Sequence, residues 1–144
     1  MPSFSNMKQL EQYVNQMAKE SMLRGNSVKN MVIDTGERHV QSDVYDVYSP
    51  DPNNPKSYKR TGLLKESWEV EETLNGIEIY NSREDEGRNI PEIIETGKGY
   101  QFNFEYNGKP RPFIENTLEE LRRRESELTD ALRQDMKANG LNVK

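Results

Sequence analysis

One histidine, many carboxylates and no cysteine are the groups in this chain that could support chemistry. His39 lies near Glu37 and Asp43, and a helix would place His39 and Asp43 on one face because residues four apart are neighbours there. A carboxylate beside an imidazole can orient the ring or share a metal ion with it. One histidine and one carboxylate are fewer ligands than a metal site usually needs. We therefore interpret His39 as a packing or surface residue, and we treat a metal-assisted hydrolase around it as the weakest hypothesis.

Two sets of acidic residues and one run of basic residues are of the types that bind metal ions, catalyse hydrolysis or bind nucleic acids. Glu84-Asp85-Glu86 could supply oxygen ligands to Ca²⁺, but the spacing is not that of an EF-hand loop. Glu92 and Glu95 could form the carboxylate pair of a hydrolase, or simply the polar face of a short turn. Arg122-Arg123-Arg124 has glutamates close by, which favours solvated ion pairs over a nucleic-acid contact. We expect no catalytic residue, no cofactor and no metal, and hence no enzyme.

The composition indicates a thin hydrophobic core. Leu, Ile, Val and Phe make up about one fifth of the 144 residues, near the border of disordered proteins. We expect a single domain over residues 1–144 that buries further surface by associating with copies of itself. No apolar run is long enough for a membrane span or a signal sequence, so we expect a protein that does not enter membranes.

The net charge of −5 is concentrated in the middle of the chain. Residues 66–95 carry ten acidic and two basic side chains. Coulomb repulsion opposes specific binding of DNA by this segment, but a passage lined by such a segment would let DNA slide through.

The N-terminal part, residues 1–49, is predicted to be a helical arm. Apolar residues recur every three or four positions from Met7 to Met17, with Ser3 or Ser5 as N-cap and Gly25 as the stop. A second helix should begin at Asn26 or Ser27 and end by Pro50. Thr35-Gly36 weakens it, and alternation over residues 44–48 would also fit a strand.

The middle part is predicted to be a Pro-rich loop at 50–62 and an antiparallel sheet with loops at 63–110. Strands are expected over 64–73 and 76–82, joined by a turn at Leu74-Asn75-Gly76, and over 101–106. We expect a mobile surface loop over 82–89, and a helical turn or short strand over 90–95, closed by Gly97. The loop at 83–88 is interpreted as either a docking loop or slack; its residues are Arg83, Glu84, Asp85, Glu86, Gly87 and Arg88.

The C-terminal part, residues 111–139, is predicted to be one long amphipathic helix. Pro112 fits its first turn, acidic residues favour its positive end, and an apolar stripe runs to Met136. The stripe could contact the rest of this chain or a neighbouring subunit. The fold class is therefore α+β, with N-terminal helices, a small antiparallel sheet and a C-terminal helix.

Three short segments, in this order, resemble the tail-completion or head-to-tail joining proteins of long-tailed bacteriophages, which are often described as putative minor tail components of the neck. The first segment is Tyr58-x-Arg60-Thr61-Gly62-x-Leu64-x-x-Ser67, the second is Ile94-Glu95-Thr96-Gly97, and the third is Arg111-Pro112-Phe113-Ile114. The segment Val44–Pro50 also looks like versions of this family from phages of Gram-positive hosts.

The resemblance implies a non-enzymatic virion protein that joins head and tail, or terminates the tail tube, as a homo-oligomeric ring such as a hexamer or dodecamer. Tail-tube and head-completion proteins would be its neighbours at the head–tail junction, with the host cytoplasm as the place of assembly and DNA passing through unbound. By analogy, Thr61-Gly62 sets the entry to the sheet, Glu95-x-Gly97 makes a tight reversal, and Arg111-Pro112-Phe113 anchors the last helix. The alternative is a soluble non-viral binding module that uses its C-terminal helix.

Overall fold

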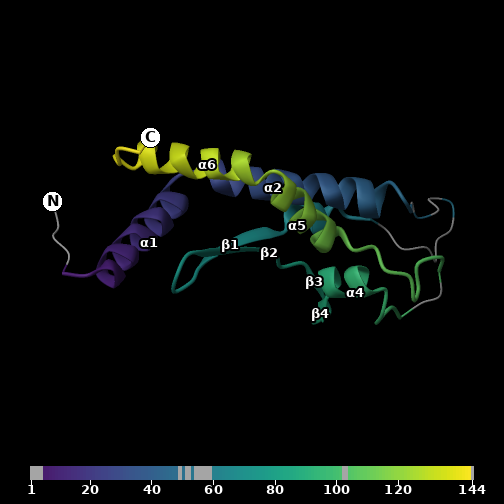
Figure 1. The fold of residues 1–144 in the computed structure, drawn as a ribbon. Helices are drawn as coiled ribbons and strands as arrows, with labels where there is room; N and C mark the ends of the chain where they lie inside the picture. Colours follow the sequence, from purple (N-terminus) through teal and green to yellow (C-terminus); the bar gives the residue numbers. More distant parts are fainter. Residues whose placement is uncertain (1–4, 49, 51–52, 54–59, 102–103, 144) are drawn as a thin grey trace. The chain divides into compact units, whose positions relative to one another are not determined.

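The computed structural model describes residues 5–48, 50, 53, 60–101 and 104–143, and confirms the α+β class (Figure 1). The chain divides into two compact units. Unit 1 comprises Met1–Val32, Val70–Ile79 and Arg124–Lys144, and unit 2 comprises Ile33–Glu69 and Tyr80–Arg123. Predicted Tyr58 and most of the predicted Pro-rich loop lie outside the described residues. No helix within the described ranges is long and apolar enough to cross a membrane.

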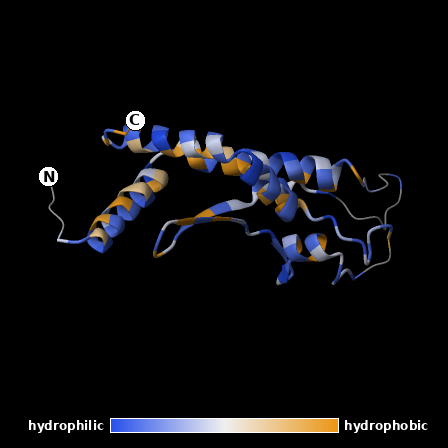
Figure 2. Ribbon diagram, in the orientation of Figure 1, coloured by the Kyte–Doolittle hydropathy of each residue, from blue (hydrophilic) through white to orange (hydrophobic). Residues whose placement is uncertain are grey.

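Unit 1 contains α1 (Met7–Arg24), the first part of α2 (Ser27–His39) and α6 (Glu125–Ala138), with α1 packed against α6. Both predicted N-terminal helices are confirmed. The N-cap of α1 is Asn6, whose side chain accepts a hydrogen bond from the Gln9 amide at 2.9 Å, so the expectation of a serine cap was wrong. Figure 2 shows that hydrophobic residues recur along α1.

A buried carboxylate of α6 caps the start of α2. Asp135 is 2% exposed and accepts hydrogen bonds from the amides of Ser27 at 2.9 Å and Val28 at 3.0 Å. Gly25 is needed beside it, because a Cβ there would lie 2.2 Å from Asp135 Oδ1. The cap therefore joins segments more than 100 residues apart in the sequence.

In unit 2, α2 continues into a π-helix, η1 (Val40–Tyr45), so the alternative of a strand over residues 44–48 was wrong. The core of this unit comes from η1, from the short helices α3 (Leu63–Glu66) and α4 (Ile90–Thr96), and from α5 (Phe113–Arg123). Its buried side chains are Val40, Val44, Leu64, Ile94 and Phe113.

The only tryptophan of the chain also packs in unit 2. The Trp68 ring meets Phe113 edge-on at 6.4 Å between ring centroids. The ring lies against Gly36, where a Cβ would approach it to 2.5 Å. The sequence predicted only that Gly36 weakens the helix. In the structure the helix is continuous at Gly36, and the missing side chain leaves room for the indole.

The strands are shorter than predicted. Residues 63–66 form helix α3, because Gly62 takes a left-handed conformation (φ 81°) that turns the chain into it. The first strand, β1 (Trp68–Glu72), therefore begins four residues late and pairs with β2 (Ile77–Asn81). Among the described residues, 101–106 contain no strand, and residues 105–108 form a turn.

Two further expectations are corrected. Residues 84–89 are a small hairpin, β3 (Glu84–Asp85) and β4 (Arg88–Asn89), because Glu86 and Gly87 adopt positive φ angles of 52° and 76° that suit a two-residue turn. The C-terminal helix is interrupted at Arg124 (φ −105°, ψ 31°), which separates α5 from α6.

Candidate functional site

The three sequence segments that carry the resemblance meet in unit 2. Leu64, Ile94 and Phe113, one from each segment, belong to the same buried cluster. The Arg111 amide donates a hydrogen bond to the Ile94 carbonyl at 2.9 Å, which joins the second segment to the third. The segments are thus parts of one packed body.

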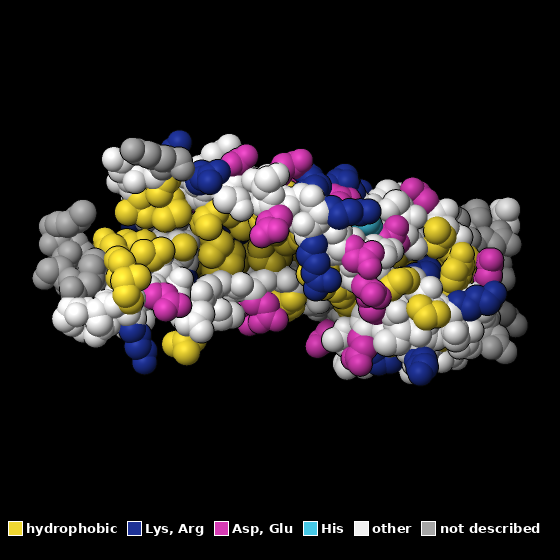
Figure 3. All heavy atoms as spheres, viewed as in Figure 1, with side chains coloured by type: hydrophobic (Ala, Val, Ile, Leu, Met, Phe, Trp, Pro, Cys, Tyr) yellow, Lys and Arg dark blue, Asp and Glu magenta, His cyan; other side chains and the backbone are white. Residues whose placement is uncertain are grey.

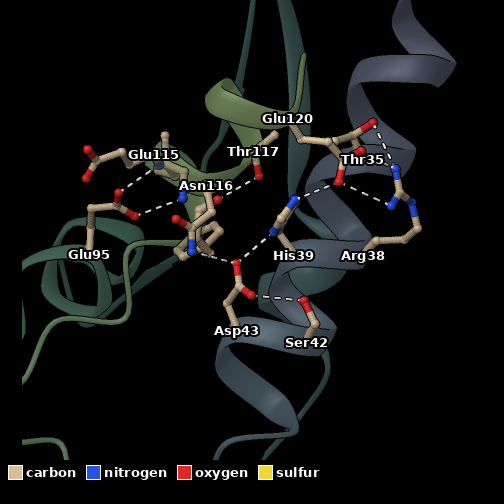
Figure 4. Close-up of polar contacts among 12 residues, drawn as sticks. Thr35, Arg38, His39, Ser42, Asp43, Glu95, Glu115, Asn116, Thr117 and Glu120 are labelled. Atoms are coloured by element: carbon tan, nitrogen blue, oxygen red, sulfur yellow. Dashed lines mark hydrogen bonds and ion pairs between the residues drawn. The ribbon is translucent and has the colours of Figure 1, made fainter. Parts of the chain in front are cut away.

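Glu95 caps α5, a role that the sequence did not reveal. Its two carboxylate oxygens each accept a backbone N–H at 2.9 Å, one from Ile114 and one from Glu115 (Figure 4). An anion at a helix N-terminus satisfies unpaired amides and interacts favourably with the helix dipole. Pro112 lies just before this helix, which begins at Phe113, and its carbonyl accepts the Asn116 amide.

Gly97 ends α4 in a left-handed conformation (φ 74°), which makes the reversal that the motif predicted. Its amide donates to the Ile93 carbonyl, and its carbonyl accepts the Gly108 amide at 2.7 Å. A Cβ at Gly97 would lie 2.5 Å from the backbone of Lys109. Only glycine fits both the conformation and the contact.

The first segment fastens α3 to the π-helix. Arg60 donates to the carbonyls of Tyr45 at 3.2 Å and Tyr48 at 2.5 Å, and its guanidinium lies 4.2 Å from the centre of the Tyr45 ring. Thr61 Oγ accepts the Leu63 amide at 3.3 Å. Ser67 donates to the Leu63 carbonyl through Oγ and accepts the Ser82 amide at 2.8 Å through its own carbonyl.

Arg111 is buried among aromatic rings. It is 7% exposed, donates to the Tyr100 hydroxyl at 2.8 Å, and lies 4.7 Å from the centre of the Tyr106 ring. Sequence reasoning missed this environment, although the aromatic alternation after Tyr100 was the available signal. That alternation had predicted a strand instead.

Arg111 borders a pocket of unit 2 to which the predicted docking loop contributes. Arg83, Asp85 and Arg88 of the β3–β4 hairpin line the pocket, together with Arg60 and Arg111. The other residues of that hairpin loop, Glu84, Glu86 and Gly87, are exposed. We call this the arginine pocket.

His39 joins α2 to α5. Its Nδ1 lies 2.7 Å from Asp43 Oδ2, which confirms the predicted shared face, and its Nε2 lies 3.0 Å from Glu120 Oε1 (Figure 4). Arg38 also contacts Glu120 at 2.6 Å, and Asn116 donates to Asp43 at 3.1 Å. A neutral imidazole can donate to only one of the two carboxylates, whereas a protonated ring donates to both. Both ring nitrogens thus face a carboxylate of this chain, which fits a packing role.

Glu120 was missed from the sequence because it lies 81 residues from His39. In the part of the chain that the structure describes, no group of three or more His, Asp and Glu side chains could hold a metal ion.

Comparison with known proteins gives two matches of nearly full length. A sequence profile of the family described as YomN matches residues 6–138. A relative from Bacillus subtilis strain 168, described as the SPbeta prophage-derived uncharacterized protein YomN, is 39% identical over 139 residues, which cover 94% of this chain and 95% of the relative. No solved structure matches the chain.

Proposed function

The chain belongs to the YomN family, and we propose that it is a structural protein of a bacteriophage particle that joins head and tail, or terminates the tail tube, as a homo-oligomeric ring. The prophage origin of its relative supports a phage origin for this chain. The ring and its place in the neck come from the resemblance of the three sequence segments to head-to-tail joining proteins.

One observation carries this proposal: the three segments form a single packed body. Each contributes a side chain to the core, and each is hydrogen-bonded to another part of unit 2. A fold shared with head-to-tail joining proteins would require the three segments to pack together in this way. The resemblance therefore concerns a three-dimensional unit.

Apolar side chains on the surface of unit 1 offer area for subunit contacts. Met7 is 77% exposed, Val14 is 48% exposed and Leu74, at the tip of the β1–β2 hairpin, is 88% exposed. Figure 3 shows hydrophobic side chains gathered over α1 and α6. Large exposed apolar groups that lie together are typical of interaction surfaces.

The proposed partners are further copies of this chain, the tail-tube protein and a head-completion protein. In the ring, acidic residues of the segment 66–95 would repel the DNA backbone and let the genome pass without specific binding. No catalytic step is required of any residue. The protein would occupy the head–tail junction of the virion, after assembly in the host cytoplasm.

The non-viral binding module has weaker support. That hypothesis assigned the C-terminal apolar stripe to an external partner. In unit 1, α6 already packs against α1, so part of this stripe is used within the chain. The surface available to an external partner is correspondingly smaller.

The test has two parts. Light scattering and native mass spectrometry would count subunits of the purified chain, alone and beside the tail-tube protein. Electron microscopy of particles from a phage that lacks the gene should show separate heads and tails, and immunogold labelling of intact particles should mark the neck. The proposal is overturned if the chain is monomeric both alone and beside the tail-tube protein and is also absent from purified particles.

A further inference from the structure

The arginine pocket combines an apolar interior with several cations. It measures about 120 Å³, and its walls include Ile90, Ile93 and Tyr45. This space is close to that of engineered cavities that admit a benzene-sized group, so it fits one aliphatic side chain. Arg60, Arg83, Arg88 and Arg111 line it against a single carboxylate, that of Asp85.

The positive charge of this pocket is incompletely compensated. Arg111 is more than nine-tenths buried, its Nε has no hydrogen-bond partner, and no ion pair joins it to a carboxylate among the described residues. Arg88 Nε is likewise buried without a hydrogen-bond partner, and Arg88 reaches Asp85 only through Nη2, in a long ion pair of 3.9 Å. Burying unpaired charge is costly, and an incoming carboxylate would reduce that cost. The pocket therefore suits a group that presents an apolar side chain together with acidic ones.

The β1–β2 hairpin of the same chain has this chemistry. Leu74 at its tip is 88% exposed. The Thr73 amide donates to the Gly76 carbonyl and the Ser82 amide to the Ser67 carbonyl, which fixes a register with Glu71 opposite Glu78. Both glutamates are exposed and lie on one face, since directly opposite residues of two antiparallel strands project from the same face. The hairpin therefore presents an exposed apolar side chain beside a pair of carboxylates.

We propose that the tip of this acidic hairpin in one copy inserts Leu74 into the arginine pocket of the next copy, with its glutamates facing the arginines there. This inference rests on the proposed ring, for which it names the interface. Because tip and pocket are different surfaces, the contact is head-to-tail, the kind of contact that builds a ring when its rotation closes. It uses the hairpin carboxylates at the interface, while Asp85 lines the pocket and Glu95 caps α5, so only the remaining acidic residues of 66–95 are left for the lumen.

The test exploits the absence of cysteine from the chain. One variant carries Leu74→Cys and another carries Thr61→Cys, an exposed residue that lines the pocket. Under mild oxidation, the mixture should give a disulfide-linked heterodimer. The variant with both substitutions should give a ladder of disulfide-linked oligomers on a non-reducing denaturing gel. The largest oligomer should contain as many subunits as the ring. In the matched control, Met7→Cys replaces Leu74→Cys on another highly exposed site, 77% against 88%, and the ladder should be lost.

Charge reversal provides the second measurement. Glu78→Arg and Arg88→Glu should each abolish the ladder in the double-cysteine chain, and the two reversals together should restore it. Crosslinking no faster than in the control, or unaffected by either reversal, overturns the inference. If rings form without this crosslink, the inferred interface is wrong and the proposed function stands. If the ladder forms but the chain is absent from phage particles, the inferred interface stands and the proposed function is wrong. A free acidic peptide that binds the pocket while rings stay intact would assign the pocket to another partner.

Discussion

Replacing Glu95 by alanine should destabilise unit 2 by removing the cap of α5. The carboxylate accepts two backbone N–H groups at 2.9 Å, and both amides would lose their partner. A hydrogen bond to a charged group contributes about 1.5–3 kcal/mol. Two such bonds would sum to about 3 kcal/mol or more, but water can reach the Glu115 amide, whose residue is exposed, so we expect a loss of about 2 kcal/mol, the upper end for removal of a helix cap. Glu95→Gln keeps one acceptor and should lose about half of this.

Glu92→Ala is the matched control, since Glu92 is an exposed glutamate on the same helix, α4. Its loss should change the free energy of unfolding by less than about 0.5 kcal/mol. Urea denaturation followed by the fluorescence of Trp68 reports on this core, because the indole packs against Phe113. A slope of about 2 kcal/mol per molar urea converts the expected loss into a midpoint shift of about 1 M. An equal shift for Glu92→Ala and Glu95→Ala would refute the capping role.

Three further substitutions test close contacts in both units. Asp135→Ala should cost about 2–4 kcal/mol because it leaves two amides of α2 unpaired in a buried site, whereas the exposed Asp130→Ala should cost little; circular dichroism during thermal unfolding compares them. Gly36→Ala usually stabilises a helix, but here the new Cβ meets the indole ring, so we expect a lower melting temperature and altered tryptophan fluorescence. Gly97→Ala should destabilise more than Gly108→Ala in the same assay, since both glycines have positive φ but only the first faces backbone at 2.5 Å.

Features with a local signal were predictable from the sequence. The apolar spacing and Gly25 placed α1, and Gly97 correctly marked the end of α4. The hairpin at 84–89 had half of its signal, since Gly87 suits the second position of a two-residue turn but Glu86 is not a residue that favours the first. The density of charge in that segment was interpreted as a loop instead. The break at Arg124 coincides with a gap in the apolar stripe between Leu121 and Leu128.

Features that depend on distant residues were not predictable. The amides capped by Glu95 lie 19 and 20 residues away, and those capped by Asp135 lie more than 100 residues away. Nothing in the neighbouring sequence distinguishes these carboxylates from solvated ones. The same holds for Glu120, which completes the surroundings of His39 only when α5 lies beside α2. The sequence therefore identified the motif residues of the candidate site, but it did not predict which residues they contact.

The motif residues and the proposed interface residues make different demands on the chain, which allows folding and assembly to be separated. Glu95 and Gly97 bond to or pack against backbone, so their loss acts on the free energy of unfolding. Leu74 is almost fully exposed, so Leu74→Asp should leave that free energy nearly unchanged. If the chain forms a ring through the acidic hairpin, Leu74→Asp abolishes assembly of a stable monomer, whereas Glu95→Ala lowers stability but leaves the specificity of the contact intact. The opposite pattern would mean that the motif residues themselves make the subunit contact.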